Sequence, residues 1–264
     1  MGLSCLGKYL AMKKIFKHSP TTKLSINVVA LVGGGTNPMP GEISLAHNGV
    51  LFLDEFPEFS RQVLEVLRQP LEDRTITVSR AKYTVDYPAG FMLVASMNPC
   101  PCGYYTHPTR QCTCAPGAVA RYKNRISGPL FDRIDIQVFI DPVPIDELAK
   151  ATEGESSAEI RNRVVRARTI QTKRFEAVPG VYTNAQMNSK MLRKYCPLDA
   201  ETMAVLTHAI NKFQMSARAY DRILRVARTI ADLDGSPDIR KHHISEALSY
   251  RAMDRATWGA TLPT

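Results

Sequence analysis

Two carboxylates, Asp54 and Glu55, follow directly after the apolar run Val50 to Leu53. This run is too short for a buried helix and is typical of a strand covered on both faces of a parallel sheet. Ligand sites in open α/β sheets lie at the carboxyl ends of the strands. In one interpretation Asp54 holds Mg²⁺ and Glu55 polarises a water that attacks a γ-phosphate. In the other, a core strand simply runs into an acidic turn, and the rest of the chain must decide.

A second apolar run, residues 91–95, leads into Ser96, Met97 and Asn98, followed by Pro99. An Asn at the end of a neighbouring buried strand can hydrogen-bond the same water or phosphate that Glu55 addresses. An Asn before a proline is also common in ordinary turns. Two buried strands that each end in polar residues at one sheet edge favour the functional interpretation.

Cysteines then occur in two close pairs, Cys100 with Cys102 and Cys112 with Cys114. Four thiolates on a loop that folds back can form a tetrahedral Zn²⁺ site. A C-x-C pair is a weaker signal for zinc than C-x-x-C, because a single spacer restricts the turn. Zinc is the favoured interpretation, and free thiols or an oxidised pair remain as alternatives.

The composition restricts the class of protein and its partners. The chain has 264 residues, a formal net charge of +9 and six cysteines. The positive charge favours an anionic partner such as nucleic acid or nucleotide, although a diffuse basic surface gives the same total. No apolar run approaches the ~20 residues of a membrane span. The sequence also shows no secretory signal, so we expect a cytoplasmic protein without a membrane partner, whose cysteines are thiols or metal ligands.

Hydrophobic periodicity and turn residues predict the elements that must position these side chains. In the first half of the chain they predict a β-like run at Val28–Val32, a turn-rich loop at 33–41, a short helix at 42–47, a helix after the N-cap Ser60, and a strand at 138–140.

A hairpin is predicted from the alternating runs 75–78 and 83–85, with residues 79–82 at its tip. Arg80 and Lys82 make this tip basic. A basic tip is most often a solvated turn, but it can also contact nucleic-acid phosphates.

The prolines of residues 141–144 indicate a linker, and the chain beyond them is predicted to be helical. His242 and His243 lack the spacing to share one helical face, so we interpret them as surface or capping residues rather than as a metal pair. The expected helices cover residues 145–151, 157–175, 186–195, 199–213, 217–233 and 243–252.

Near the N-terminus, Gly2 to Lys8 fit the phosphate-loop spacing G-x-x-x-x-G-K. A working phosphate loop needs a strand that leads into it and a small hydroxyl residue for Mg²⁺. The sequence offers no such strand, and Tyr9 stands in the hydroxyl position. We therefore interpret the match as coincidental and expect the chain alone to lack nucleotide-binding and hydrolytic activity.

The ordered series of motifs resembles the AAA+ ATPases of the magnesium-chelatase-like group, and within it the bacterial ComM/YifB competence-type proteins. Members carry a strand and a G-x-x-x-x-G-K-[ST] loop upstream of the matched region. The resemblance covers roughly residues 28 to 251, and the stretches that carry it are 29–35, 40–55, 97–103, 127–135 and 216–233.

This resemblance implies an α/β fold with three parts: an atypical or truncated start at 1–26, a partial AAA+ P-loop NTPase core at 27–143, and an all-α helical lid domain at 144–264. It implies ATP and Mg²⁺ as cofactors, a homo-oligomeric hexameric ring, and DNA as the partner. The residue roles that it implies are Asp54 and Glu55 as Walker B, Asn98 as sensor 1, Arg133 as an arginine finger on a neighbour's nucleotide, and Arg218 as sensor 2.

Two other functions remain open at this point. One is a motor subunit of a magnesium chelatase that remodels a tetrapyrrole metal-insertion enzyme; the cysteine-rich insert argues against it. The other is a non-catalytic, zinc-dependent DNA-binding or scaffold protein. The missing phosphate loop favours this second alternative, whereas Glu55, Asn98, Arg133 and Arg218 disfavour it.

Overall fold

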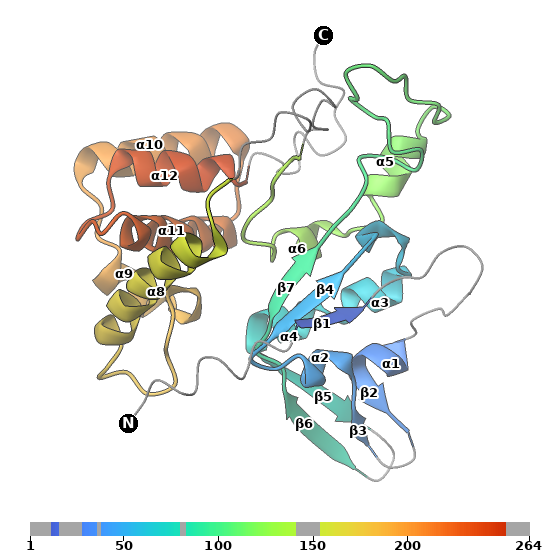
Figure 1. Ribbon diagram of the computed structural model, residues 1–264, viewed down its shortest axis with the longest axis horizontal. Helices are drawn as coiled ribbons and strands as arrows, with labels where there is room; N and C mark the ends of the chain where they lie inside the picture. The colour runs from blue at the N-terminus through green and yellow to red at the C-terminus, as the bar shows by residue number, and fades with distance from the viewer. Residues whose placement is uncertain (1–11, 16–27, 36–37, 80–82, 141–153, 252–264) are drawn as a thin grey trace. The chain divides into compact units, whose positions relative to one another are not determined.

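The computed structural model describes residues 12–15, 28–35, 38–79, 83–140 and 154–251. The chain forms two compact units, Met1–Arg133 and Ile134–Thr264. The first unit contains all the strands of the described part, and the second contains only helices (Figure 1). This distribution confirms the α/β class, while the predicted boundary at 143/144 falls outside the described residues.

A parallel sheet of three strands, in the order β1-β4-β7, forms the centre of the first unit (Figure 1). Strand β4 (Val50–Leu53) pairs with β1 (Met12–Ile15) on one side and with β7 (Met92–Ala95) on the other. The predicted strand is confirmed; Leu51 and Leu53 are fully buried, whereas Val50 and Phe52, on the other face, are only partly covered. Strand β1 was not predicted.

Strand β7 differs from the expectation of full burial. Met92 is 63% exposed and Val94 is 39% exposed. Within the described residues β7 pairs only with β4, so it is an edge strand. An apolar run predicts a strand, but it does not reveal how much of the strand its neighbours cover.

Short helices contribute buried residues to the core of this unit. They are α2 (Glu42–Leu45), α3 (Arg61–Glu65) and α4 (Arg68–Asp73). Ser60 is the predicted N-cap of α3, and its Oγ accepts a hydrogen bond from the Val63 backbone N–H at 3.4 Å. The single helix expected after Ser60 is broken between α3 and α4. Val63, Leu64 and Leu67 are buried, so the apolar face continues across the break.

The β-like run expected at Val28–Val32 is wrong, because these residues form helix α1 (Val28–Val32). A short apolar run carries too little periodicity to separate strand from helix. The following glycines form β2 (Gly33–Gly34), antiparallel to β3 (Met39–Pro40). Gly33 has φ of 103°, and a Cβ there would lie 2.1 Å from the Met39 carbonyl oxygen. Only glycine fits this crossing.

The predicted hairpin is confirmed as β5 (Thr75–Ser79) and β6 (Thr84–Pro88), paired antiparallel. Ile76 and Val78 are buried, while the alternate residues face solvent. Arg80 and Lys82, at the expected tip, lie outside the described residues. Helices α5 (Ala118–Lys123) and α6 (Gly128–Phe131) complete this unit, and Ser127 caps α6 through a 3.3 Å bond from Leu130 N–H.

The second unit confirms each predicted helix that falls on described residues. These are α8 (Ser157–Arg174), α9 (Ser189–Tyr195), α10 (Ala200–Phe213), α11 (Ala217–Leu233) and α12 (Lys241–Ser249), with a 3-10 turn at Asn184–Gln186. Helix α11 is the most buried element and packs against α8, α9 and α12. Ser216 caps it, as predicted, through a 3.2 Å bond from Ala219 N–H. The helix expected at 145–151 lies outside the described residues.

The strand expected at 138–140 is wrong. These residues have no regular structure, and Ile140 is 89% exposed. The segment contacts the helical unit through a hydrogen bond from Gln137 N–H to the Tyr250 carbonyl oxygen at 2.9 Å. With no strand beside it within the described residues, the alternating pattern has no sheet to join.

A buried ion network lies inside the helical unit. The fully buried carboxylate of Asp232 accepts hydrogen bonds from Nη2 and Nη1 of Arg174, at 2.5 and 2.7 Å. The Arg228 Nε and the Asn184 amide contact the same carboxylate, at 3.2 and 2.7 Å. One carboxylate therefore pairs with two largely buried cations and links α8, the 3-10 turn and α11. None of the helices in the described residues is both long and apolar enough to cross a bilayer.

Replacing Asp232 with alanine should lower the free energy of unfolding by about 3–5 kcal/mol, because two buried guanidinium groups lose their counter-charge. Urea unfolding followed by far-ultraviolet circular dichroism measures this change. Glu201→Ala is the matched control, since Glu201 forms an exposed ion pair with Lys241 at 3.0 Å and should affect stability little. Equal effects of the two variants would contradict a structural role for the network.

Candidate functional site

Hydrogen bonding between β4 and β7 continues past the ends of both strands. Ser96 N–H donates to the Leu53 carbonyl at 3.0 Å, and Phe56 N–H donates to the Ser96 carbonyl at 2.9 Å. The Ser96 hydroxyl donates to Asp54 Oδ1, and the Glu55 N–H donates to the same oxygen at 3.0 Å. Both bonds fall on Oδ1 and orient the carboxylate. The second oxygen, Oδ2, receives no hydrogen bond from the described residues and can serve as a metal ligand.

Glu55 follows in a left-handed backbone conformation, with φ of 50° and ψ of 45°. A residue with a Cβ incurs a cost of about 1–2 kcal/mol in this region, so the conformation must be held by its surroundings. The 3-10 turn Phe56–Glu58 follows at once, with Phe56 and Pro57 buried. The chain therefore turns sharply after the strand, and the Glu55 carboxylate remains exposed to solvent.

Asn98 is exposed two residues beyond Ser96, and its backbone lies near enough to the Tyr122 hydroxyl to affect the pKa of that group. Tyr122 is buried in α5. Burial, followed by the negative charge of Glu58 and then that of Glu55, raises the pKa of Tyr122 to about 12. The phenol is therefore neutral at physiological pH and lies within the field of these carboxylates. Tyr122 thus connects the polypeptide that leaves β7 with the acidic turn after β4.

The structure thus brings Asp54, Glu55 and Asn98 to one edge of the sheet, as the sequence predicted. It adds Ser96 and Tyr122, which the sequence analysis missed as site residues. Ser96 could have been found by extending the parallel register by one residue beyond β4 and β7, which places it opposite Asp54. Tyr122 carried no such signal, because a long loop separates it from the strands.

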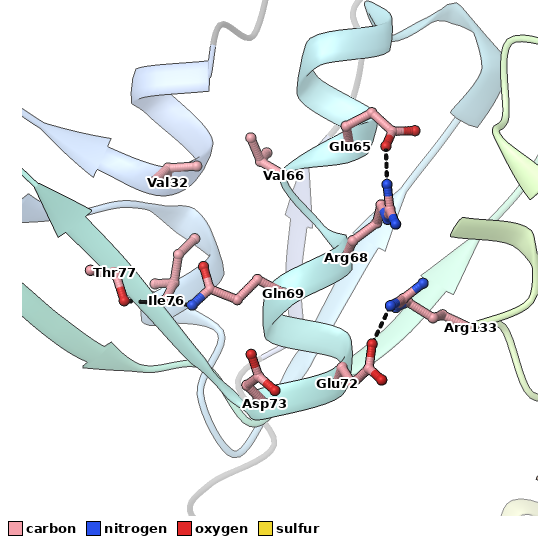
Figure 2. Close-up of a pocket in the computed structure, with 10 residues that line it drawn as sticks. All are labelled: Val32, Glu65, Val66, Arg68, Gln69, Glu72, Asp73, Ile76, Thr77 and Arg133. Carbon is pink, nitrogen blue, oxygen red and sulfur yellow. Dashed lines mark hydrogen bonds and ion pairs between the residues drawn. The ribbon is translucent and has the colours of Figure 1, made fainter. Parts of the chain in front are cut away.

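Arg133 lies elsewhere in the first unit and is largely buried, with its side chain 8% exposed. Its Nη2 forms an ion pair with Glu72 of α4, and its Nη1 donates to the Pro129 carbonyl at 2.6 Å. Figure 2 shows the guanidinium directed toward Glu72 at the edge of a cavity of about 540 Å³. The same cavity is lined by Gln69 and by Arg68, which pairs with Glu65 at 2.8 Å.

Arg218 lies in the first turn of α11 in the second unit, and it is exposed. Arg218 is predicted to be sensor 2, and Arg133 is predicted to be an arginine finger; both roles require a bound nucleotide, and that of Arg133 also requires a neighbouring subunit. Both roles therefore remain predictions.

The four cysteines converge, as the sequence predicted for a metal site. The Sγ atoms of Cys100 and Cys102 are 3.3 Å apart, those of Cys102 and Cys112 are 3.5 Å apart, and those of Cys100 and Cys112 are 3.8 Å apart. All four Sγ atoms, including that of Cys114, lie within 4.8 Å of one another. These distances exceed the ~2.05 Å of a disulfide, so the thiols are not oxidised to one another.

His107 lies between the two cysteine pairs in the sequence but does not join the cluster. Its Nδ1 accepts hydrogen bonds from the backbone N–H groups of Thr109 and Arg110, at 3.2 and 3.1 Å. The ring nitrogen is therefore occupied within its own turn.

The group formed by Asp234, His242 and His243 also has the composition of a metal site. However, His243 Nδ1 accepts the Arg240 N–H at 2.9 Å at the start of α12, and its Nε2 contacts Asp234 at 3.0 Å. In the neutral tautomer that accepts at Nδ1, the Nε2 atom carries the proton and donates to the carboxylate. This geometry confirms the prediction of a capping residue.

Comparison with known proteins finds a family for both parts of the chain. The family model described as magnesium chelatase, subunit ChlI, matches residues 6–148, and the model for the C-terminal part of that subunit matches residues 154–251. The match therefore begins further toward the N-terminus than the stretches noted in the sequence.

Individual relatives point to a narrower group. The chain is 48% identical to the competence protein ComM of Haemophilus influenzae over 232 residues, which are 88% of this chain and 44% of that protein. It is 47% identical to YifB of Escherichia coli over the same length and share of each chain. An uncharacterised protein of Mycobacterium bovis is 40% identical over 228 residues, 86% of this chain and 44% of its own.

The chain belongs to the magnesium-chelatase-like AAA+ family, in the ComM/YifB group. It spans less than half the length of the curated relatives that it matches.

Proposed function

We propose that this chain provides the Walker B and sensor part of a ring-forming, ATP-hydrolysing AAA+ motor that acts on DNA in competence-linked recombination, for example by branch migration. The observation that carries the proposal is the Asp54 carboxylate, oriented by Ser96, beside an exposed Glu55 held in a left-handed conformation. Both lie at the carboxyl ends of paired parallel strands, the position at which α/β sheets bind ligands.

In this proposal each residue has a distinct task. Asp54 offers Oδ2 to Mg²⁺, because Oδ1 is engaged by Ser96 and by the Glu55 N–H. Glu55 orients and polarises the attacking water, and the Asn98 side chain positions that water or the γ-phosphate. Bound Mg²⁺ would neutralise charge that develops on the phosphate oxygens. Phosphoryl transfer depends on the positioning of groups rather than on covalent chemistry. The oriented Asp54 carboxylate is suited to holding a metal ion, and the exposed Glu55 and Asn98 are accessible to water and phosphate.

Nucleotide binding requires a phosphate loop in addition to these residues. Gly2 to Lys8 lie outside the described residues, and the chain matches less than half of ComM. We infer that the phosphate loop is contributed by sequence upstream of the matched region, as the family resemblance implies. The chain alone is then expected to bind nucleotide weakly or not at all.

The motor would complete its site by assembly into a ring. We propose that Arg133 acts on the nucleotide of a neighbouring subunit of a hexamer, and that Arg218 in the helical lid contacts the nucleotide of its own subunit. Arg133 pairs with Glu72 and contacts Pro129 within its own chain. Arg133 must therefore break its ion pair with Glu72 to reach a neighbouring subunit. The Glu72 carboxylate thus competes with the neighbour's nucleotide for the Arg133 guanidinium.

DNA is the proposed substrate because the chain is basic and carries a hairpin with two cations at its predicted tip. The net charge is +9, and β5 and β6 extend the hairpin to Ser79 and Thr84 on either side of Arg80 and Lys82. The relative named as a competence protein supports a role in DNA uptake or recombination.

A chelatase motor is the second candidate, since both matching family models are described by a magnesium chelatase subunit. The relatives at 47–48% identity belong instead to the ComM/YifB group, which favours the DNA motor. A non-catalytic, zinc-dependent DNA-binding or scaffold protein is the third candidate. ATP hydrolysis that does not depend on the Glu55 carboxylate would favour it.

Replacing Glu55 with glutamine should abolish ATP turnover, with a loss of at least about 100-fold, while nucleotide binding is retained. The measurement is steady-state ATP hydrolysis by a chain extended upstream through a phosphate loop, using the corresponding residues of the Haemophilus influenzae relative. Glutamine keeps the size and polarity of the side chain but cannot polarise the water as a carboxylate does.

The matched control is Glu58→Gln, three residues further on, because Glu58 pairs with Arg125 at 2.8 Å and has no proposed contact with water or phosphate. Its turnover should stay close to that of the parent. Unchanged hydrolysis in Glu55→Gln would remove the assigned role of Glu55 and favour the non-catalytic alternative.

Replacing both Arg80 and Lys82 with alanine should weaken DNA binding and make the negative slope of log affinity against log salt shallower by about 2, one for each lost phosphate contact. Fluorescence anisotropy with a labelled oligonucleotide at several salt concentrations measures both quantities. The control is the double variant Arg161→Ala, Arg166→Ala, which removes the same charge from the exposed face of α8. If the two double variants behave alike, the hairpin has no special role and only net charge matters.

A further inference from the structure

The segment between β7 and α5, residues 96–117, contains no helix or strand. Cys100 is fully buried, and every other residue of this loop is at least partly exposed. Long loops without regular structure are uncommon in compact domains, because the chain entropy lost on ordering must be offset by contacts. The apolar core does not supply those contacts here, so another interaction must hold the loop.

The thiol cluster has the dimensions of a site for one tetrahedral metal ion. With Zn–S bonds of about 2.3 Å, a regular tetrahedron places sulfur atoms about 3.8 Å apart. The measured Sγ separations of 3.3, 3.5 and 3.8 Å lie close to this value. An iron–sulfur cluster distributes its four thiolates over two or four irons, so the full set of sulfurs lies further apart than around a single ion.

Backbone N–H groups and a cation lie beside the cluster. The Tyr105 backbone N–H donates to Cys100 Sγ at 3.3 Å, and backbone N–H groups of Tyr104 and Thr113 interact with Cys102. The buried Lys123 lies close enough to Cys100 for their charges to interact, and its Nζ lies 4.9 Å from the ring centre of Tyr105. A zinc ion with four thiolates carries a net charge of −2, so the N–H donors and a nearby cation stabilise it.

We propose that Cys100, Cys102, Cys112 and Cys114 bind one structural Zn²⁺ that cross-links residues 96–117 and fixes the position of Asn98 at the end of β7. Four protein ligands leave no open position for a substrate, so the centre is structural rather than catalytic. Soft thiolate donors in a tetrahedral set select zinc over the hard cations Mg²⁺ and Ca²⁺.

The link to Asn98 follows from the short distance along the chain. Only Pro99, with its fixed φ, separates Asn98 from the buried ligand Cys100. The Asn98 backbone also lies near the Tyr122 hydroxyl of α5, the helix that follows the second cysteine pair. The metal would therefore hold the backbone on which Asn98 is displayed. Zinc binding itself does not depend on the proposed ATPase function; only the consequence for Asn98 does.

Metal analysis of the purified wild-type chain tests the proposal directly. We expect one zinc per chain, loss of the bound ion in Cys112→Ser and in Cys114→Ser, and retention in two controls. His107→Ala separates a four-cysteine site from one that uses the intervening histidine. Cys196→Ala removes a buried thiol that lies in the second unit, outside the cluster. A wild-type chain that contains no zinc and fails to take up added Zn²⁺, or one that contains iron, would overturn the proposal.

A second measurement uses the wild-type chain and so does not depend on whether a cysteine variant folds. Removal of zinc with a chelator should speed amide hydrogen exchange in residues 96–117, Asn98 included, and added Zn²⁺ should restore the slow exchange. Strand β4 should be unaffected, because its amides are held by the sheet. Exchange in the loop that does not respond to zinc would contradict the cross-linking role. Both readouts are independent of ATP turnover, so they can fail without affecting the Glu55 test.

Discussion

The parallel pairing of β4 with β7 determines where the polar residues of the candidate site can lie. Because the two strands run in the same direction and in register, Leu53 lies beside Ala95, and the next residues leave the sheet together. The contact between Ser96 and Asp54 is a direct consequence of this register. Two segments that are distant in the sequence thereby supply one constrained carboxylate, one exposed carboxylate and one exposed amide at a single edge.

The two strand ends are held in different ways. After β4 the chain turns within a few residues, and the buried Phe56 and Pro57 stabilise the unfavourable conformation of Glu55. After β7 the chain enters a long loop whose fully buried residue is a cysteine. Local packing can therefore fix Glu55, whereas Asn98 depends on an interaction such as the thiol cluster and on the Tyr122 hydroxyl. The proposed motor site needs both residues in place, and under that proposal the loop is part of the site.

The sequence allows prediction of the features that depend on neighbouring residues in the chain. Strand β4, the hairpin and the capped helices of the second unit all carry local periodicity or capping signals. The helix at Val28–Val32 and the absence of a strand at 138–140 could not be predicted, because short apolar runs acquire their structure from the partners they meet. Tyr122 likewise reaches the site only through tertiary structure. The cysteine spacing permitted a metal site, but only the fold shows that the four thiols converge.

The central claim is that Asp54, oriented by Ser96, is the metal ligand of a nucleotide site at this sheet edge. The most direct test is the affinity for Mn²⁺ in the presence of ATP, measured on a chain extended upstream through a phosphate loop. Mn²⁺ is added to the protein with ATP, and the concentration of free Mn²⁺ is followed by electron paramagnetic resonance. Asp54→Asn should weaken Mn²⁺ binding in the nucleotide complex by at least about tenfold, while ATP binding without metal is unchanged. Asp86→Asn, a change of the same kind in the hairpin, should leave both affinities unaltered. If Asp54→Asn binds Mn²⁺ as tightly as the parent chain, the account of this site is wrong.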